Sequence, residues 1–169
     1  MALIKPVNGI SPIIGKGCFL ADNATIVGEV ELGDHCSVWF QAVVRGDVNS
    51  IKVGSGTNIQ DGVIIHGTYR KASTTILENV SIGHRAIVHG CVVETGALIG
   101  MGAIVMDHAV VGEGALVAAG SVVLQGTRIP AGMLYAGVPA REIRPVDDEL
   151  REVIMRTPQN YIKYASWYD

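Results

Sequence analysis

Residues 97–123 read ALIGMGAIVMDHAVVGEGALVAAGSVV, and this stretch decides the fold. An aliphatic residue returns at every sixth position, at Ile99, Val105, Val111, Val117 and Val123. A period of six residues fits neither an amphipathic helix nor simple alternation along a strand. It is typical of short strands joined by tight corners, with one inward aliphatic side chain on each face.

The same period extends over most of the chain. It begins at Ile14, is interrupted after Val44, after Ile65 and after Val88, and ends near Tyr135. Three such faces close one triangular coil of roughly eighteen residues, and successive coils stack at ~4.8 Å. We therefore predict an all-β fold, a parallel β-helix of hexapeptide repeats over residues 1–145. An ordinary β-sandwich is the alternative, and the period alone does not fix the hand of the coil.

A helical tail that packs on the coil is predicted over residues 146–169. Asp147 or Asp148 is expected to cap its N-terminus, because a short acidic side chain can accept hydrogen bonds from the free N–H groups of the first turn. Pro158 is expected to break or restart the helix, since proline lacks the N–H that a helix interior needs. Residues 160–167 would then form a second turn or two.

Composition excludes several classes of protein. The chain has 169 residues, with 13 Lys and Arg against 16 Asp and Glu, so its net charge is −3 and no basic footprint for nucleic acid is present. No stretch approaches ~18 uninterrupted apolar residues, so no membrane span is expected. Cys18, Cys36 and Cys91 form no CxxC motif and are expected to be reduced thiols. With no apolar signal region at the N-terminus, we predict a cytoplasmic location.

Two of the interruptions are segments rich in polar residues. The nine-residue step after Val44 predicts a small bulge that contains Arg45-Gly46-Asp47. The eleven-residue step after Ile65 is either a turn with a protruding loop or two turns with one residue missing. Its polar and basic content favours the loop.

The histidines are placed by the phase of the repeat. His66 and His89 each follow an inward aliphatic residue, so both are expected on one corner, one coil apart and separated by ~4.8 Å. His84 has another phase and projects from a different corner. A symmetric trimer could bring it to the pair of a neighbouring subunit. Three imidazoles leave one position for water, as in a catalytic zinc site. The alternative is three unrelated surface histidines, the reading we adopt for His35 and His108.

At these residues the chain resembles the γ-class carbonic anhydrase family within the left-handed β-helix superfamily. The resemblance covers residues 10–165 and is carried by Arg45-Gly46-Asp47, by NIQDGVIIH at 58–66 and by IGHRAIVHG at 82–90. The loop after the first histidine, GTYRK at 67–71, is short and contains no acidic residue. The sequence is therefore similar to the short-loop branch of that family.

The resemblance implies a left-handed coil, a homotrimer and a metal ion at each subunit interface. His66 and His89 of one chain and His84 of its neighbour would be the ligands. Zn²⁺ is the implied ion, and Fe²⁺ or Co²⁺ would accept the same ligands. The implied reaction is the reversible hydration of CO₂ to bicarbonate by a metal-bound hydroxide.

Roles for six further residues follow from the same resemblance. Gln60 would hydrogen-bond the metal-bound water, Asn58 would line the CO₂ pocket, and Tyr161 would point at the site, with Tyr164 as the competing choice. Three residues would be structural: Arg45 and Asp47 as an interface ion pair, and Asp61 as support for the Arg45 region or for a ligand.

Other activities remain compatible with this scaffold. A metal-dependent acyl-CoA thioesterase would use the same hydroxide. A hexapeptide acyltransferase would bind CoA along the coil and need no metal. A metal- or siderophore-binding protein would hold the ion without catalysis.

Overall fold

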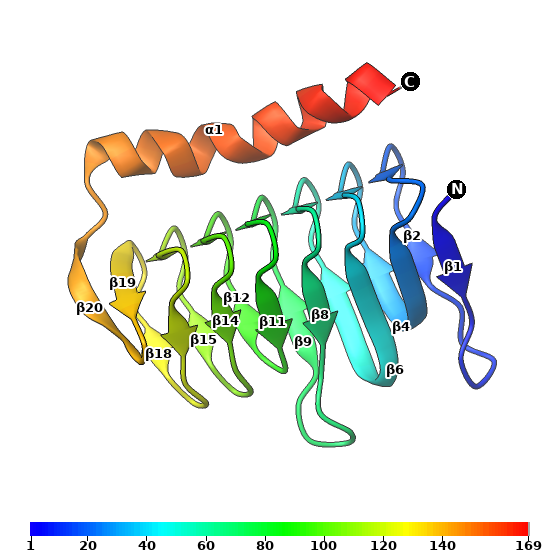
Figure 1. Cartoon of the computed structure of the whole chain (residues 1–169), viewed down its shortest axis with the longest axis horizontal. Helices are drawn as coiled ribbons and strands as arrows, with labels where there is room; N and C mark the ends of the chain where they lie inside the picture. The colour runs from blue at the N-terminus through cyan, green and yellow to red at the C-terminus, as the bar shows by residue number, and fades with distance from the viewer. Residues whose placement is uncertain (169) are drawn as a thin grey trace.

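Short parallel strands wind into a three-sided coil in the computed structural model, which describes residues 1–168 (Figure 1). Strands of successive turns pair in register, so each turn lies directly over the one before. The chain descends the near side, crosses the bottom and climbs the far side as it advances from right to left, which makes the coil left-handed. The predicted fold, a left-handed parallel β-helix with a C-terminal helix, is confirmed.

The three sides are called faces 1, 2 and 3 in chain order. Face 1 contains β1 (Leu3–Lys5), β8 (Ile64–His66), β11 (Ile87–His89), β14 (Ile104–Val105) and β17 (Val122–Val123). Face 2 contains β2 (Ile13–Ile14), β9 (Thr74–Ile76), β12 (Val92–Val93), β15 (Val110–Val111) and β18 (Arg128–Ile129). Two longer strands, β4 (Thr25–Leu32) and β6 (Val43–Val53), run through the corner between faces 1 and 2 and join them into one sheet.

Face 3 is a separate sheet. It contains β3 (Phe19–Leu20), β5 (Ser37–Val38), β7 (Asn58–Ile59), β10 (Ser81–Ile82), β13 (Leu98–Ile99), β16 (Leu116–Val117) and β19 (Met133–Gly137). The antiparallel strand β20 (Ala140–Pro145) closes its C-terminal end.

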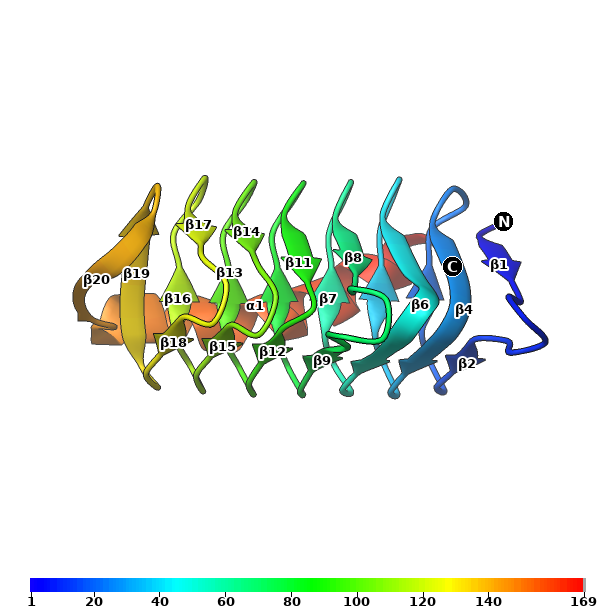
Figure 2. The ribbon, with the colours of Figure 1, turned by 90° about the horizontal axis from the view of Figure 1, so that it is seen from below.

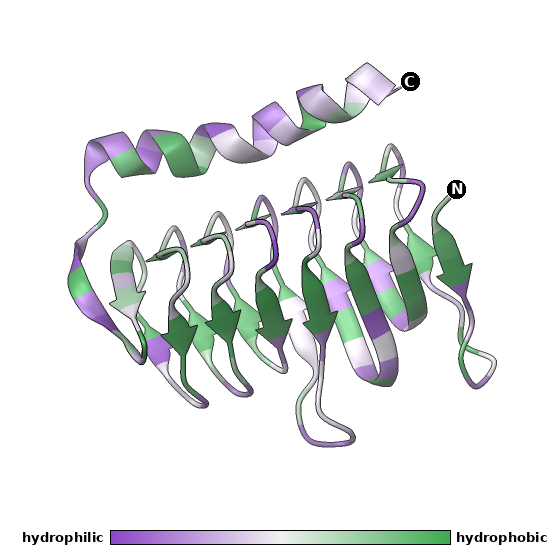
Figure 3. Ribbon diagram, viewed as in Figure 1, coloured by the Kyte–Doolittle hydropathy of each residue, from purple (hydrophilic) through white to green (hydrophobic). Residues whose placement is uncertain are grey.

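The core is built from three columns of inward side chains, one column for each face. The column of face 1 is Ile26, Val44, Ile65, Val88, Val105 and Val123, and all six are fully buried. Apolar residues accordingly mark the strands in Figure 3. β-Branched side chains suit this narrow prism because they are stiff and pack well on a pleated surface.

The interruptions after Val44 and after Ile65 both lie at the corner between faces 1 and 2. The register between β4 and β6 shifts between Gly28 and Val30, which confirms the predicted bulge. Gly28 has a φ of +77°, and a Cβ there would lie 2.3 Å from the carbonyl oxygen of Gly46, so only glycine fits. Residues 67–73 form the protruding loop, seen below β8 and β9 in Figure 1.

A single helix, α1 (Asp148–Ala165), lies along face 3 and is followed by the 3₁₀ turn η1 (Ser166–Tyr168) (Figure 2). Asp147 is the N-cap, and its carboxylate accepts a hydrogen bond from the backbone N–H of Leu150. The predicted break at Pro158 is wrong, because α1 continues through it. Pro158 is buried, and packing against face 3 holds the helix on both sides of it. No helix within residues 1–168 has the length and apolar character needed to cross a membrane.

Candidate metal centre

His66 and His89 face each other at the corner between faces 1 and 2. They end β8 and β11, and these two strands pair with His66 directly opposite His89. Nδ1 of His66 lies 3.2 Å from Nε2 of His89, and the ring centroids are 5.2 Å apart. The predicted juxtaposition of these two side chains is therefore present within one chain.

A carboxylate stands behind each ring. Nε2 of His66 lies 3.0 Å from Oδ1 of Asp47, and Nδ1 of His89 lies 2.5 Å from Oδ1 of Asp107. A carboxylate accepts hydrogen bonds, so each of these nitrogens carries the N–H. In the neutral rings the two facing nitrogens then both present lone pairs. Two lone pairs at this distance repel each other unless a cation lies between them.

This arrangement fits a zinc ion. Zn–N bonds are ~2.0–2.1 Å long, and a tetrahedral angle between two of them places the nitrogens about 3.3 Å apart. The distance of 3.2 Å between the two imidazole nitrogens matches that edge. Carboxylates that hold the far nitrogens of metal-binding imidazoles are also the usual second layer of such sites.

Both carboxylates are held in the ionised state. Partial burial raises the pKa of Asp47, but hydrogen bonds from His66 and Arg45 outweigh that effect and bring the pKa below its usual value. Burial likewise raises the pKa of Asp107, and hydrogen bonds from Thr68 and His89 lower it further than burial raises it. The charge that orients each imidazole therefore persists throughout the neutral pH range.

Hydrogen bonds from the protruding loop and from β9 brace the pair, and sequence reasoning missed them. Thr68 Oγ1 donates to Asp107 Oδ2 over 2.5 Å. Thr74 Oγ1 donates to the carbonyl oxygen of His66 over 2.5 Å and accepts from the N–H of Gly90 over 2.9 Å. Asp107 was also missed. The coil length of roughly eighteen residues could have found it, since Asp107 lies one turn beyond His89.

His84 lies at the corner between faces 3 and 1, as its phase predicts. Its Nδ1 is 2.8 Å from Oδ2 of Asp61, so of the two roles considered for Asp61 the structure favours support of a ligand. Its Nε2 is 3.4 Å from the hydroxyl oxygen of Tyr161. Tyr164 instead packs edge-to-face against Tyr161, with ring centroids 5.6 Å apart. Burial, reinforced by the nearby Asp61 and Tyr164, raises the pKa of Tyr161 to about 12, so its phenol is neutral.

Gln60 and Asn58 form a buried polar pair next to His84. Gln60 Nε2 donates to Asn58 Oδ1 over 3.0 Å, and Gln60 Oε1 accepts from the backbone N–H of His84 over 3.2 Å. Asn58 Nδ2 donates to Ser81 Oγ over 2.8 Å. Asn58 is only 1 % exposed and is fixed between Gln60 and Ser81.

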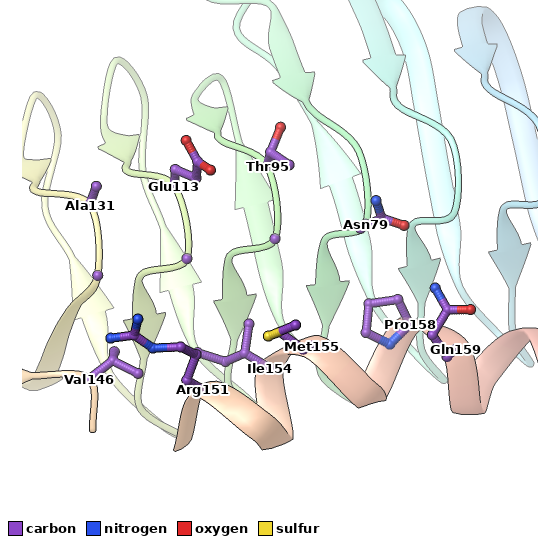
Figure 4. A pocket seen from close by; sticks show the side chains of 13 residues that line it. Asn79, Thr95, Glu113, Ala131, Val146, Arg151, Ile154, Met155, Pro158 and Gln159 are labelled. Carbon is purple, nitrogen blue, oxygen red and sulfur yellow. The ribbon is translucent and has the colours of Figure 1, made fainter. Parts of the chain in front are cut away.

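Within residues 1–168 of one chain, no cluster of three or more His, Cys, Asp or Glu residues could hold a metal ion. His66 and His89 supply two ligands, and His84 lies on another corner. A cavity of about 600 Å³ lies elsewhere, between α1 and the turns at the corner of faces 2 and 3 (Figure 4). It is lined by residues such as Asn79, Glu113 and Met155, and none of the predicted site residues reaches it.

Comparisons with known proteins agree with this class of fold. The family model for bacterial transferase hexapeptide (six repeats) matches residues 11–46. Carbonic anhydrase of Geobacillus kaustophilus is 40 % identical over 167 residues, which are 98 % of this chain and 91 % of that protein. Gamma carbonic anhydrase 2, mitochondrial, of Arabidopsis thaliana is 45 % identical over 160 residues, which are 92 % of this chain. The chain spans 58 % of the length of that plant relative.

A solved structure, that of a hexapeptide transferase family protein from Anaplasma phagocytophilum, superposes with a TM-score of 0.95. It is 40 % identical, and the match covers 99 % of this chain and 98 % of that one. The fold and site define a hexapeptide-repeat β-helix protein with paired histidines on one corner. The chain belongs to the γ-class carbonic anhydrase-like family of these proteins.

Proposed function

We propose that the protein is a γ-type carbonic anhydrase that reversibly hydrates CO₂ to bicarbonate. The observation that carries this proposal is the facing pair, Nδ1 of His66 and Nε2 of His89, with a carboxylate behind each ring. In this proposal the protein is a homotrimer, and His84 of the adjoining subunit supplies the third ligand. Asp61 holds Nδ1 of His84, which leaves Nε2 free to bind the ion.

Zinc is the proposed ion, and Fe²⁺ and Co²⁺ suit the same imidazoles. Zinc held by three neutral imidazoles lowers the pKa of water to about 7, which provides hydroxide at neutral pH. The contribution of the chain is to orient each ring and to fix which of its nitrogens carries the N–H. Asp47, Asp107 and Asp61 do this by accepting the N–H of His66, His89 and His84 respectively.

Three further residues are proposed to act around the ion. Gln60 lies beside the backbone of His84, so its amide is placed to orient the attacking water. Asn58 fixes the orientation of that amide. Tyr161, 3.4 Å from Nε2 of His84, is a neutral hydrogen-bonding group at the edge of the site and is our candidate for a relay of protons to solvent. The protruding loop has no acidic side chain for that task.

The first test combines metal content, mass in solution and CO₂ hydration by stopped flow. We expect a trimer with one metal per subunit, loss of hydration after chelation, and recovery when Zn²⁺ is returned. His84→Ala should abolish both metal binding and hydration. His35→Asn is the matched control, because His35 is exposed with a φ of +57° that asparagine tolerates. Hydration that survives complete removal of metal would contradict the proposal.

A complementation experiment tests whether the site is shared between chains. His66→Ala and His84→Ala chains are unfolded together and refolded at equal amounts. Each mixed trimer then contains one interface with all three histidines, so random mixing restores about a quarter of the wild-type activity. A site built within one chain would instead remain inactive in every mixture.

Acyl transfer is the second candidate, because a solved structure described as a putative acetyltransferase of Bacillus cereus is 38 % identical and superposes with a TM-score of 0.96. Acetyl-CoA cleavage and acetyl transfer should be measured on the metal-loaded and the chelated protein. Metal-dependent cleavage without CO₂ hydration would favour a thioesterase. Transfer that persists without metal would favour an acyltransferase.

A further inference from the structure

Two cysteines lie on successive turns at the corner between faces 2 and 3. Strand β3 pairs with β5 so that Phe19 lies opposite Ser37, and Cys18 and Cys36 immediately precede these residues. Neighbouring strands place their Cα atoms about 4.8 Å apart. That separation is within the ~4.4–6.8 Å that a disulfide requires.

The thiols are directed along the stack. Sγ of Cys18 donates to the carbonyl oxygen of Gly33 over 3.1 Å, and Gly33 belongs to the turn that carries Cys36. Sγ of Cys36 donates to the carbonyl oxygen of Gly54, one turn further, over 3.2 Å. Both sulfurs therefore lean in the same direction along the stack, and that of Cys18 leans toward the level of Cys36. Gly17, which directly precedes Cys18, has a φ of +65°.

The two thiols differ in reactivity and access. The neighbouring Cys36 side chain lowers the pKa of Cys18 to about 7, and Cys18, together with burial, raises the pKa of Cys36. Cys18 is half-buried and lines a cavity of about 300 Å³ together with Ile162 and Ala165 at the end of α1, whereas Cys36 is buried. A reactive, reachable thiol beside a buried one is the arrangement of an attacking and a resolving cysteine.

We propose that Cys18 and Cys36 are a redox-active pair that reacts with hydroperoxides and closes to a disulfide across the first two turns of the coil. The Cys18 thiolate attacks the peroxide O–O bond, becoming a sulfenic acid and releasing hydroxide or alkoxide. The Cys36 thiol then displaces that oxygen, forming the S–S bond, and the oxygen leaves with a proton as water. The two cysteines lose two electrons in total, and the peroxide accepts both. None of the candidate metal-site residues takes part.

The test uses the folded, metal-loaded protein, reduced and freed of reductant. One equivalent of H₂O₂ should produce a Cys18–Cys36 linked peptide, and after denaturation and alkylation the oxidised protein should carry two fewer alkyl groups than the reduced protein. In Cys36→Ser the reaction should stop at a sulfenic acid on Cys18, detected with dimedone. Cys91→Ser is the matched control and should form the disulfide as the wild type does, because Cys91 is fully buried at another position.

Native alkylation gives an independent measurement. Iodoacetamide should modify Cys18 at least about tenfold faster than Cys36 or Cys91, with a midpoint near pH 7. The proposal is overturned if peroxide links the pair only in urea, if the disulfide joins different chains, or if Cys18 passes directly to the sulfinic acid. A circular dichroism spectrum of each variant establishes that it has folded.

Discussion

At the scale of single residues, Asp107 determines which nitrogen of His89 carries the N–H and which presents its lone pair. Its Oδ1 lies 2.5 Å from Nδ1 of His89, and Thr68 holds its other oxygen. In Asp107→Asn the amide lacks the charge that favours one tautomer. We expect metal affinity to fall roughly 10–100-fold. Competition with a chromogenic chelator measures the loss. Glu149→Gln, an exposed exchange of carboxylate for amide, should leave affinity unchanged, and equal losses in both variants would contradict this role.

Tyr161 and Tyr164 offer a matched pair of phenols on one helix. Only Tyr161 places its hydroxyl within 3.4 Å of His84 Nε2. Tyr161→Phe keeps the ring against Trp39, 5.3 Å away, and removes only the oxygen. We expect the turnover of CO₂ hydration to fall severalfold at low buffer concentration and to recover as buffer takes over the proton transfer. Tyr164→Phe should match the wild type, and the reverse order would reassign the relay.

The placement of the histidines could be predicted from the phase of the repeat, whereas the contacts of Asp47 and Asp107 with them were not predicted. The phase of the repeat places His66 and His89 on one corner because each follows an inward aliphatic residue. Asp107 lies one turn beyond His89, but it follows Met106 rather than an inward aliphatic residue, so the phase of the repeat does not by itself indicate its contact with His89. Asp47 was noticed for its partner Arg45, and its contact with His66 came only with the folded bulge. Contacts made by outward side chains depend on corner geometry, which a six-residue period does not specify.

At the scale of elements, α1 shows where a local rule yields to packing. Proline at an interior position commonly ends a helix because it removes a hydrogen bond and crowds the preceding turn. Here the hydroxyl of Thr157 donates to the carbonyl oxygen of Val153 over 2.6 Å. Ile154 and Pro158 are both buried. The apolar side of α1 that packs on face 3 thus extends to the proline itself. The sequence of the tail alone does not show this packing, so it could not predict that the helix continues.

The N-cap of α1 is expected to make the stability of the protein depend on pH. A hydrogen bond from the N–H of Leu150, together with Arg144, holds the pKa of Asp147 below its usual value of 3.8. The unfolded chain therefore takes up this proton at higher pH than the folded chain does. The cap's contribution to stability is present above pH 3.8 and is lost as the pH falls through the lower, folded-state pKa.

Thermal unfolding should separate the hydrogen bond of this cap from its charge. Asp147→Ala removes both, so the midpoint should fall at neutral pH and depend less on pH below about 4 than the wild type. Asp147→Asn keeps an effective N-cap, so its unfolding midpoint at neutral pH should be close to that of the wild type. Below about pH 4 its midpoint should depend on pH as weakly as that of Asp147→Ala. Identical pH dependence in all three proteins would show that the carboxylate does not titrate with folding.

At the scale of the whole molecule, the division of the histidines between two corners has a structural cause. A straight prism with three faces keeps its corners apart, so side chains on different corners cannot converge within one chain. The residues of 1–168 in a single chain accordingly form no three-ligand metal cluster. Convergence requires that the corner between faces 1 and 2 of one copy meets the corner between faces 3 and 1 of the next. In the proposed trimer, three copies related by rotation would close such a ring, with each copy contributing both of these corners.

Arg45 tests this assembly, because it lies at the corner that must be covered. In one chain its side chain is 45 % exposed and is paired with Asp47, which in turn holds His66. Removing the guanidinium leaves a carboxylate without its partner where the adjoining subunit would exclude water, and an unpaired charge there is costly.

For Arg45→Ala we expect the concentration at which the oligomer dissociates to rise at least about tenfold, with metal lost in parallel. Sedimentation velocity over a dilution series, with metal analysis of each species, measures both. Lys52→Ala on the same strand, whose exposed ammonium is 4.0 Å from Glu31, should leave both unchanged. A variant that keeps its oligomeric state but loses metal would confine Arg45 to orienting Asp47 and remove it from the interface.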